Sequence, residues 1–374
     1  MTSGSKLWES PDGAVHVSRW PVRADDPMQA WDGADTYLLE ALSEEPEGPV
    51  LLVNETFGAM ATALAASGRP VVAWGDSELA RLALRANCDR AGVAVPWGPI
   101  TERPPVLADA FAVALVRIPK DLRGFKDTLA RLAQVLPEGT PVLMGAKSKQ
   151  VHKSHVGAAQ SSLGPANSTL ARHRARLVRA VRHGGDVPSV VGSRWELEPG
   201  VLIDALPGVF GEKALDEGTR LLLEEIDTWH DARSIVDLGC GTGALGLVAA
   251  ARNPDSELRF FDSSHRAVRS AEKSWRASFG DRTAWFEAAD VLTGVESDSV
   301  DVVLCNPPFH QGTEVTRRVA AHMFAESSRV LRPGGRLLVV GNRHLGYHVG
   351  MGRTLRDVNT LRSSKRFAVM EGRR

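Results

Sequence analysis

The most distinctive residues for chemistry are Asn306, Pro307, Pro308 and Phe309, which follow the apolar run 300–305. The amide oxygen of Asn306 and the backbone carbonyl of Pro307 are two acceptors that could hold both hydrogens of an exocyclic amine. The lone pair of such a nitrogen is delocalised into the ring, so positioning would be most of the catalysis. Proline fixes φ and makes the carbonyl rigid, while Phe309 offers a face for an extruded base. A plain strand followed by a proline turn is the less favoured alternative.

A second motif is a glycine-rich loop that contains Asp237, Gly239, Gly241 and Gly243, between an apolar run and an apolar helical segment. Glycine lacks Cβ, so a strand-to-helix turn with these residues lets a ligand approach the backbone closely. Asp237 could hold an ammonium group of that ligand, directly or through water. Because such turns serve several nucleotide cofactors, the loop predicts a cofactor site without naming the cofactor. The alternative is an ordinary glycine-rich turn.

Two further carboxylates follow the next expected strands. Asp262 comes directly after the run 258–261, where a carboxylate can accept from both hydroxyls of a ribose. Its alternative role is an N-cap for the next helix, for which Ser263 and Ser264 compete. Asp290 could accept from an adenine amino group, although its Asp-x-Leu-x-Gly context equally suits a plain turn.

Alternating strands and helices must position these residues. We expect strands at 234–238, 258–261, near 284–287, at 300–305, at 336–340 and finally at 367–370, with helices between most of them. Such alternation predicts a parallel sheet covered on both faces, with ligands at the carboxyl ends of the strands. Each candidate residue named above lies at such an end.

The first half of the chain repeats this layout. The matching segments are 49–65, 71–87, 111–119 and 135–144 in the first half and 237–250, 258–275, 302–308 and 330–340 in the second. Matches in the same order at a nearly constant offset indicate an internal duplication. The first copy has Asn54, Glu55 and Thr56 in its loop and Arg117 in the place of Asn306. We therefore expect a degenerate first domain whose side chains fill the cofactor pocket.

The motifs resemble those of the class I S-adenosylmethionine-dependent methyltransferases, and Asn-Pro-Pro-Phe resembles the subset that methylates exocyclic or amide nitrogens. The stretches 210–223, 306–311 and 342–347 further resemble the bacterial ribosomal RNA guanine-N2 methyltransferases, the large-subunit type more than the small-subunit type. The resemblance is dense from about Pro207 onward and thin before it.

This resemblance implies an α/β fold of two tandem Rossmann-like domains with mostly parallel seven-stranded sheets, the N-terminal one degenerate. It implies S-adenosyl-L-methionine as cofactor, which Phe210 and the stretch 216–219 could cover; the alternative for this stretch is a helix that only packs on the sheet. The implied reaction is methylation of a guanine N2 in ribosomal RNA, with 23S preferred and 16S possible. The degenerate domain would hold RNA and support the catalytic half.

The domain boundary is expected between Gly184 and Glu198, where glycine and proline interrupt the periodicity. The resulting domains are 1–190, degenerate and RNA-binding, and 191–374, catalytic.

Local patches must bind RNA, since the chain has 45 Lys+Arg against 45 Asp+Glu. We expect RNA contacts from Arg172, Arg174 and Arg176, on either a strand or a basic helix; a solvated edge element is the alternative. At the rim of the catalytic domain the candidates for substrate contact are Arg343, His344, Tyr347 and His310, of which His310 could instead be a base or an ordinary surface histidine.

Composition excludes other classes. No run approaches the roughly eighteen apolar residues of a membrane span, and residues 1–10 lack a signal-peptide pattern. The cysteines Cys88, Cys240 and Cys305 are too widely separated for a disulfide framework or a metal site. We expect a cytoplasmic monomer, without metal or membrane, that acts on ribosomal RNA or a pre-ribosomal particle.

Three alternatives stay open on the sequence. The same chemistry could act on an adenine N6 or on a protein glutamine amide, because both use Asn-Pro-Pro-aromatic motifs. An oxidoreductase could bind a dinucleotide at the same glycine loop. The chain could also be a non-catalytic RNA-binding module of ribosome assembly.

Overall fold

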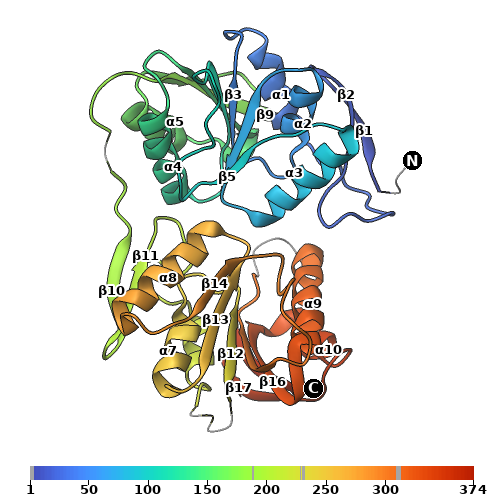
Figure 1. The fold of residues 1–374 in the computed structure, drawn as a ribbon, viewed down its shortest axis with the longest axis vertical. Helices are drawn as coiled ribbons and strands as arrows, with labels where there is room; N and C mark the ends of the chain where they lie inside the picture. The colour runs from blue at the N-terminus through green and yellow to red at the C-terminus, as the bar shows by residue number, and fades with distance from the viewer. Residues whose placement is uncertain (1–3, 188, 228, 230–231, 309–312) are drawn as a thin grey trace. The chain divides into compact units, whose positions relative to one another are not determined.

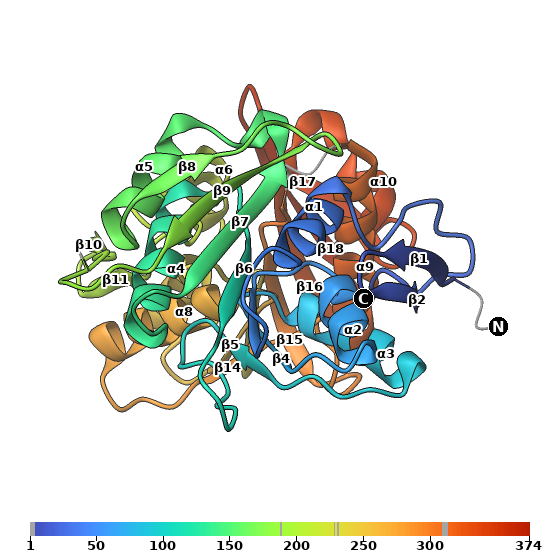
Figure 2. The same cartoon turned by 90° about the horizontal axis from the view of Figure 1, so that it is seen from above.

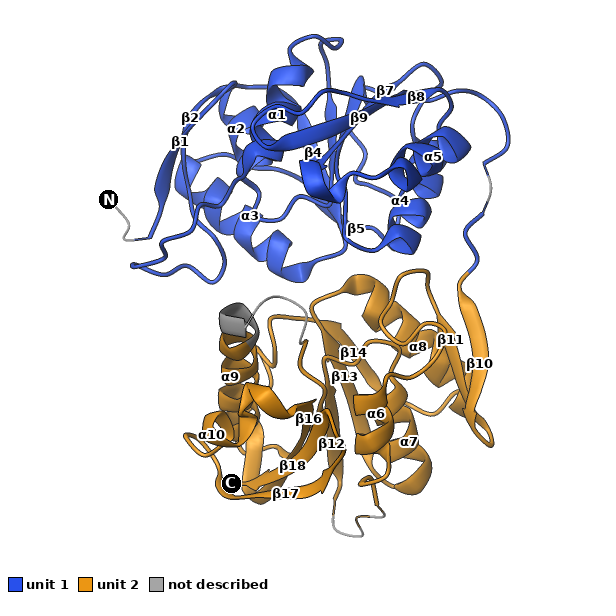
Figure 3. Cartoon of the chain, turned by 180° about the vertical axis from the view of Figure 1, so that it is seen from behind, with its two compact units in different colours: residues 1–191 blue, residues 192–374 orange. Residues whose placement is uncertain are grey.

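The computed structural model describes residues 4–187, 189–227, 229, 232–308 and 313–374. The chain divides into two compact units, Met1–Val191 and Gly192–Arg374 (Figure 3). Each unit contains a sheet of seven strands with helices packed on both faces (Figure 1). Two such sheets confirm the expected tandem Rossmann-like architecture.

The sheet of the second unit places buried apolar strands at its centre. In spatial order the strands are β14 (Trp285–Ala288), β13 (Glu257–Asp262), β12 (Ser234–Leu238), β15 (Val300–Cys305), β16 (Leu331–Asn342), β18 (Phe367–Arg373) and β17 (Arg356–Ser363). The first five run parallel, and β18 is antiparallel to both of its neighbours. The central strands β12 and β15 are buried on both faces, as a parallel sheet between two helical layers requires.

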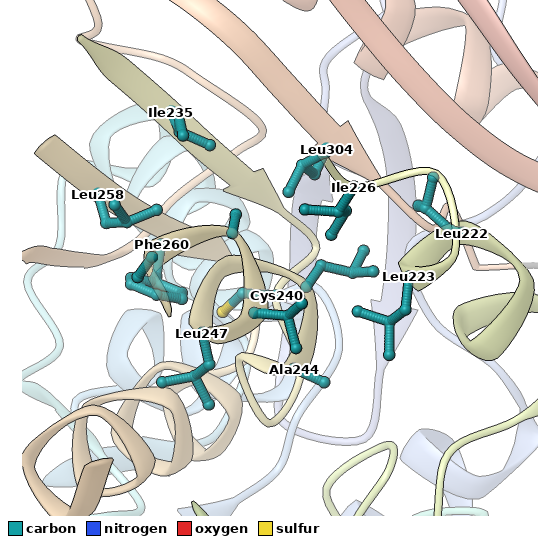
Figure 4. Close-up of a cluster of buried hydrophobic side chains, with 14 of the residues drawn as sticks. Leu222, Leu223, Ile226, Ile235, Cys240, Ala244, Leu247, Leu258, Phe260 and Leu304 are labelled. Carbon is teal, nitrogen blue, oxygen red and sulfur yellow. The ribbon is translucent and has the colours of Figure 1, made fainter. Parts of the chain in front are cut away.

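Helices cover this sheet on both sides. They are α6 (Glu217–Leu223), α7 (Ala244–Arg252), α8 (His265–Phe279), α9 (Thr313–Val330) and α10 (Tyr347–Met351), with the 3-10 turn η2 (Arg343–Leu345). One apolar cluster gathers Leu223 of α6, Cys240 of the glycine loop and Leu247 of α7 beneath that loop (Figure 4). A second cluster, around Phe324 of α9 and Tyr347, fills the opposite face.

The hairpin of β10 (Ser193–Glu198) and β11 (Val201–Ala205) opens the second unit and packs on α8. The hydroxyls of Ser270, Ser274 and Ser278 accept hydrogen bonds from the backbone N–H groups of residues 206, 204 and 202, at 3.0, 2.9 and 2.8 Å. Because residues four apart share one face of a helix, the three serines form a ladder that satisfies one edge of the hairpin.

The first unit has the same sheet topology. Its strands, in spatial order, are β5 (Trp97–Pro99), β4 (Val71–Gly75), β3 (Val50–Val53), β6 (Val113–Arg117), β7 (Pro141–Lys147), β9 (Ala175–Val181) and β8 (Ala166–Ser168). Its remaining elements are β1 (Lys6–Ser10), β2 (Gly13–Val17), α1 (Gly33–Leu42), α2 (Ala59–Ala66), α3 (Glu78–Ala91), α4 (Leu122–Val135), η1 (Ser148–Gln150) and α5 (Lys153–Ser162). Figure 2 shows α1 and α5 on opposite faces of β7 and β9. The basic stretch before the boundary is thus partly the strand β9 rather than a helix.

The two copies agree in backbone detail. Val53 of β3 pairs with Val116 of β6, as Leu238 of β12 pairs with Cys305 of β15. Asn54, the residue after β3, has φ +57°, and Gly239, the residue after β12, has φ +74°. Asparagine tolerates this left-handed conformation better than most residues, so the first copy keeps the turn after losing the glycine.

Candidate active site

The glycine loop of the second unit folds tightly against the end of β13. Gly239, Gly241 and Gly243 all have left-handed φ values of +74°, +54° and +85°. The N–H groups of Gly239 and Cys240 both donate to the carbonyl of Phe261, at 2.8 and 3.0 Å. The sequence thus predicts this turn correctly, since side chains rarely adopt these φ values.

The glycines also allow close packing within the unit. A Cβ on Gly243 would lie 3.1 Å from Ala271 of α8, and one on Gly241 would lie 3.1 Å from the carbonyl oxygen of Phe210. Phe210 is 51% exposed and lies against the loop at Gly241; its role as a cover for the cofactor stays a prediction. A further glycine, Gly246, was not predicted; a Cβ there would overlap the ring of Phe260.

Asp237 is a buried carboxylate with one unsatisfied oxygen. It is 1% exposed, and its Oδ2 accepts the Gly246 N–H at 2.9 Å. Its Oδ1 has no hydrogen-bond partner among the described residues. Burial raises the pKa of Asp237 to about 8, an effect that the Gly246 N–H opposes and the Asp262 charge strengthens. A buried, half-satisfied carboxyl of this kind fits the expected role of binding an ammonium group.

Asp262 lies beside the loop at the end of β13. Its Oδ2 accepts the Gly241 N–H at 3.0 Å and its Oδ1 accepts the Ser264 N–H at 2.9 Å. The N-cap of α8 is Ser264, whose hydroxyl accepts from Ala267 at 3.1 Å. The capping alternative for Asp262 is therefore wrong, and its ribose role stays a prediction.

Asp290 lies in a turn after β14. The N–H and hydroxyl of Thr293 both donate to its carbonyl oxygen, and its side-chain Oδ1 is 3.7 Å from Nε2 of His322 in α9. The turn alternative is realised, while the adenine role stays a prediction.

Asn306 follows β15 and lies next to the glycine loop. A Cβ on Gly239 would be 3.8 Å from the carbonyl oxygen of Asn306, which is expected because Leu238 and Cys305 are paired in the sheet. The side-chain Oδ1 of Asn306 is buried and has no partner among the described residues. Pro307 is buried and Pro308 exposed. The loop and the proline corner therefore meet, as their place at adjacent strand ends predicts.

The predictions for Phe309 and His310 lie outside the described residues. Their proposed contacts to a substrate base stay predictions.

The amide nitrogen of Asn306 is held by the start of α6. Nδ2 donates to Oγ1 of Thr219 at 2.9 Å and lies 3.5 Å from Oδ2 of Asp216. Asp216 caps α6, because its Oδ1 accepts the N–H groups of Gly218 and Thr219 at 2.8 and 3.1 Å. Only the resemblance had pointed to this stretch, as a cover for the cofactor. Its tie to Asn306 could not be read from the sequence, although Asp-x-x-Thr at a helix start is a capping signal.

Of the three described residues expected to contact substrate at the rim, two are exposed and one is buried in the core. Arg343 and His344 are exposed on η2. Tyr347 is only 3% exposed: its ring abuts Gly341 and packs edge-on against Phe324 at 5.4 Å. The interpretation of Tyr347 as a rim residue is therefore wrong, because the side chain belongs to the core beneath β16.

The predicted RNA-contacting arginines precede and enter β9. Arg172 and Arg174 are exposed, and Arg172 forms an ion pair with Glu40 at 3.2 Å. Arg176 is half-buried in β9, and its Nε has no hydrogen-bond partner among the described residues. Their contact with RNA stays a prediction.

The first unit replaces the site with a network of charges. Arg117, at the register position of Asn306, donates to Asp32 and Asp35 at 2.8 and 2.7 Å. Glu55, in the loop after β3, accepts the N–H groups of Met60 and Ala61 at the start of α2. Burial raises the pKa of Glu55 to about 8. These side chains occupy the part of the first unit that corresponds to the glycine loop and amide of the second.

The described residues contain no cluster of three or more His, Cys, Asp or Glu side chains suited to a metal ion. Within the same ranges, no helix has both the length and the apolar character needed to cross a membrane. Cys88, Cys240 and Cys305 are buried free thiols, and burial raises the pKa of each.

Comparison with known proteins decides the family. Residues 5–184 match the model of the RLMG N-terminal domain, and residues 200–371 match that of the methyltransferase small domain. Ribosomal RNA large subunit methyltransferase G of Pseudomonas putida (strain GB-1) is 40% identical over 98% of this chain and 100% of its own length. The chain belongs to the ribosomal RNA large subunit methyltransferase G family.

Other relatives agree with this family. The protein of the same name from Streptomyces avermitilis is 40% identical over 96% of this chain and 97% of its own length. A solved structure of a 16S rRNA N2 G1207 methyltransferase (RsmC) from T. thermophilus, in complex with AdoMet and guanosine, has a TM-score of 0.77 at 21% identity. It covers 99% of this chain and 98% of its own, and it shows that the fold is shared.

Membership of the methyltransferase G family confirms the expected class of enzyme, an rRNA methyltransferase, and the preference for the large-subunit type. It also confirms S-adenosylmethionine as the expected cofactor. The half-satisfied Asp237 and the tight glycine loop fit this cofactor, which carries an ammonium group and a ribose. The oxidoreductase and non-catalytic alternatives are thereby excluded.

Proposed function

We propose that this chain methylates the exocyclic N2 of a guanine in 23S ribosomal RNA. The observation that carries the proposal is the side-chain Oδ1 of Asn306, which is buried beside the glycine loop and has no hydrogen-bond partner among the described residues. A buried acceptor without a donor is costly, so the site is suited to a substrate that brings an N–H. The names of the relatives, which specify the large ribosomal subunit, support the choice of RNA.

The residues divide the work between holding and orienting. Asp237 would pair with the ammonium group of the cofactor, and Asp262 with its ribose. When bound, S-adenosylmethionine supplies an electrophilic methyl group and is converted to S-adenosylhomocysteine. Asn306 Oδ1 and the Pro307 carbonyl would each accept a hydrogen bond from one N–H group of the guanine amine and turn its lone pair toward the glycine loop. The N–C bond would form as the S–C bond breaks, and the nitrogen would lose one of its two protons to water. The gain comes from orientation, and no covalent intermediate with the enzyme is needed.

Guanine N2 is favoured over the other acceptors. An adenine N6 or a glutamine amide would satisfy the same two acceptors. The relatives are named for ribosomal RNA, which speaks against a protein glutamine, and the solved structure with the same fold is named for the N2 of a guanine, which favours guanine over adenine. We further propose that the enzyme acts as a monomer, on free rRNA or on an assembling particle. An rRNA substrate implies work in the compartment where ribosomes assemble, which in bacteria is the cytoplasm.

The test is methyl transfer with defined RNA. Purified protein and labelled S-adenosylmethionine are incubated with 23S rRNA, 16S rRNA and 50S particles from a strain that lacks the gene, and modified bases are mapped by mass spectrometry. We expect N2-methylguanosine at one site of 23S rRNA. Label in 16S rRNA, in adenine or in protein would contradict the proposal.

A further inference from the structure

A side-chain amide can bind in two orientations. Rotation about its last bond exchanges the acceptor Oδ1 for the donor Nδ2, and the neighbours decide which is presented. In the proposed function Asn306 must present Oδ1, because a presented Nδ2 would place its hydrogens against those of the substrate amine. The structure contains a device that selects the productive orientation.

The device is a chain of hydrogen bonds with a fixed direction. Asp216, as a carboxylate, only accepts, and it takes the hydroxyl proton of Thr219 on Oδ2. With its proton committed, Thr219 can only accept from its other neighbour, which is Asn306 Nδ2 at 2.9 Å. Asn306 is thereby fixed with its nitrogen toward α6, and Oδ1 is the atom left without a partner among the described residues.

We call this chain of hydrogen bonds, from Asn306 through Thr219 to Asp216, the relay. The structure holds both Asp216 and Thr219 in place. Asp216 Oδ1 is bound to the N–H groups of Gly218 and Thr219 at the start of α6. Thr219 is 5% exposed, so water has little access to replace its hydroxyl. The relay therefore joins the capping of a helix to the orientation of the amide.

The degenerate unit provides an internal comparison. Asp32 caps α1 as Asp216 caps α6, and Asp35 follows it by three residues as Thr219 follows Asp216. Arg117 stands where Asn306 stands and donates to both carboxylates. A guanidinium has no acceptor to orient, and a carboxylate takes the place of the hydroxyl that both donates and accepts. The hydrogen-bonded hydroxyl is thus present in the second unit, which has the Asn306 amide, and is replaced by a carboxylate in the first unit, which has Arg117.

We propose that Thr219, oriented by Asp216, is a positioning residue that holds the Asn306 amide with Oδ1 toward the acceptor base. This inference rests on the proposed function of Asn306. Thr219 acts through Asn306 rather than on the substrate or the cofactor, so its loss should reduce the rate of transfer without weakening cofactor binding.

The first test compares Thr219→Val with Thr219→Ser. The valine variant keeps the shape and removes both hydrogen bonds of the Thr219 hydroxyl, which leaves Asn306 Nδ2 only its long, 3.5 Å contact with Asp216 Oδ2. We expect kcat to fall about tenfold or more, with the Kd for S-adenosylhomocysteine unchanged within about threefold. The serine variant should recover most of kcat. The control Thr360→Val changes an exposed threonine of β17 and should leave both values unchanged. A parallel loss of cofactor affinity would assign Thr219 to the cofactor and overturn the inference.

A second variant tests the relay even if Thr219→Val does not fold. Asp216→Asn keeps an N-cap side chain but can donate to Thr219, which reverses the relay. We expect the same fall in kcat with a normal melting temperature. Combined with Asn306→Ala, neither variant should lower the rate further, because residues that act through one another are not additive. Additive losses would contradict the relay.

A spectroscopic measurement separates this inference from the proposed function. The side-chain NH₂ resonances of Asn306, assigned by their loss in Asn306→Ala, should shift in Thr219→Val and not in Thr360→Val. This holds even if the wild-type protein methylates a different acceptor. Unshifted resonances would refute the relay, whereas a wild type inactive on rRNA with shifted resonances would refute only the proposed substrate.

Discussion

At the scale of single residues, the site depends on polar atoms that the fold leaves unsatisfied. Asp237 and Asn306 each direct one polar atom to a structural partner and keep one acceptor unpaired among the described residues. The residue types at the strand ends were predictable from the sequence. Which atom of each is free depends on contacts from distant segments, such as α6, and these could not be read from spacing.

The carboxyl of Asp237 predicts a pH dependence of cofactor binding. Its pKa is raised from 3.8 to about 8 by burial, so the free enzyme holds it protonated at pH 7. An ammonium group would favour the carboxylate, and binding should therefore release close to one proton at about pH 7. Affinity for S-adenosylhomocysteine should rise between about pH 6 and 8. Since the folded pKa is the higher one, the stability of the free protein should fall as the pH rises from 3.8 to about 8.

Calorimetry in buffers of different ionisation enthalpy measures this proton release directly. Asp281→Asn, at an exposed position, is the matched control and should leave the release unchanged, whereas Asp237→Asn should remove it. An affinity that is constant from about pH 6 to 8 would show that Asp237 does not meet the ammonium group.

At the scale of elements, the apolar strands were the most predictable part. The strands 234–238 and 300–305 have the bounds that the sequence predicted, because buried parallel strands are continuous apolar runs. Strand β17 was not predicted, since most of its residues are polar and exposed. Its place in the sheet comes from pairing with β18, a tertiary contact without a local signal.

The serine ladder on α8 is a second element that the sequence did not reveal, because serines on a helix usually indicate a solvated face. Ser274 is fully buried and accepts the Asp204 N–H at 2.9 Å. Its replacement by alanine leaves that N–H without its acceptor, and we expect a loss of about 1–3 kcal/mol of unfolding free energy. Urea titration followed by circular dichroism measures the loss.

Ser161→Ala is the matched control for the ladder. Ser161 is exposed in α5 and donates a hydrogen bond within its own helix, so its replacement should change stability by less than about 0.5 kcal/mol. Equal effects of the two substitutions would mean that the ladder does not support the hairpin.

At the scale of the whole molecule, the two units share one fold but differ in the residues at the site. Both units keep the strand order and the left-handed residue after the first central strand. The second keeps a glycine loop and an amide, whereas the first fills the same positions with Glu55 and Arg117. The duplication was predictable from matched segments. The ion pairs that replace the site were not, because Asp32 and Asp35 lie in a segment that precedes the matched ones.

A unit without a cofactor loop can still bind RNA, and the arginines that precede and enter β9 allow a test of this role. Arg174 is exposed and Arg176 half-buried, and neither pairs with an acidic side chain among the described residues. Arg172 is already neutralised in part by Glu40. Replacing Arg174 and Arg176 by alanine should therefore weaken binding of 23S rRNA more than replacing Arg172 alone. It should also flatten the salt dependence by about 0.7–0.9 in log slope for each phosphate that the protein no longer neutralises.

The matched control replaces two exposed cations elsewhere in the same unit, Arg103 and Lys126, neither of which pairs with an acidic side chain among the described residues. It removes the same net charge, so a general electrostatic attraction would give both double variants the same slope and affinity. Filter binding at several salt concentrations distinguishes the two cases. A local contact flattens the slope only for Arg174 and Arg176, and the Kd for S-adenosylhomocysteine stays unchanged because the cofactor loop lies in the other unit.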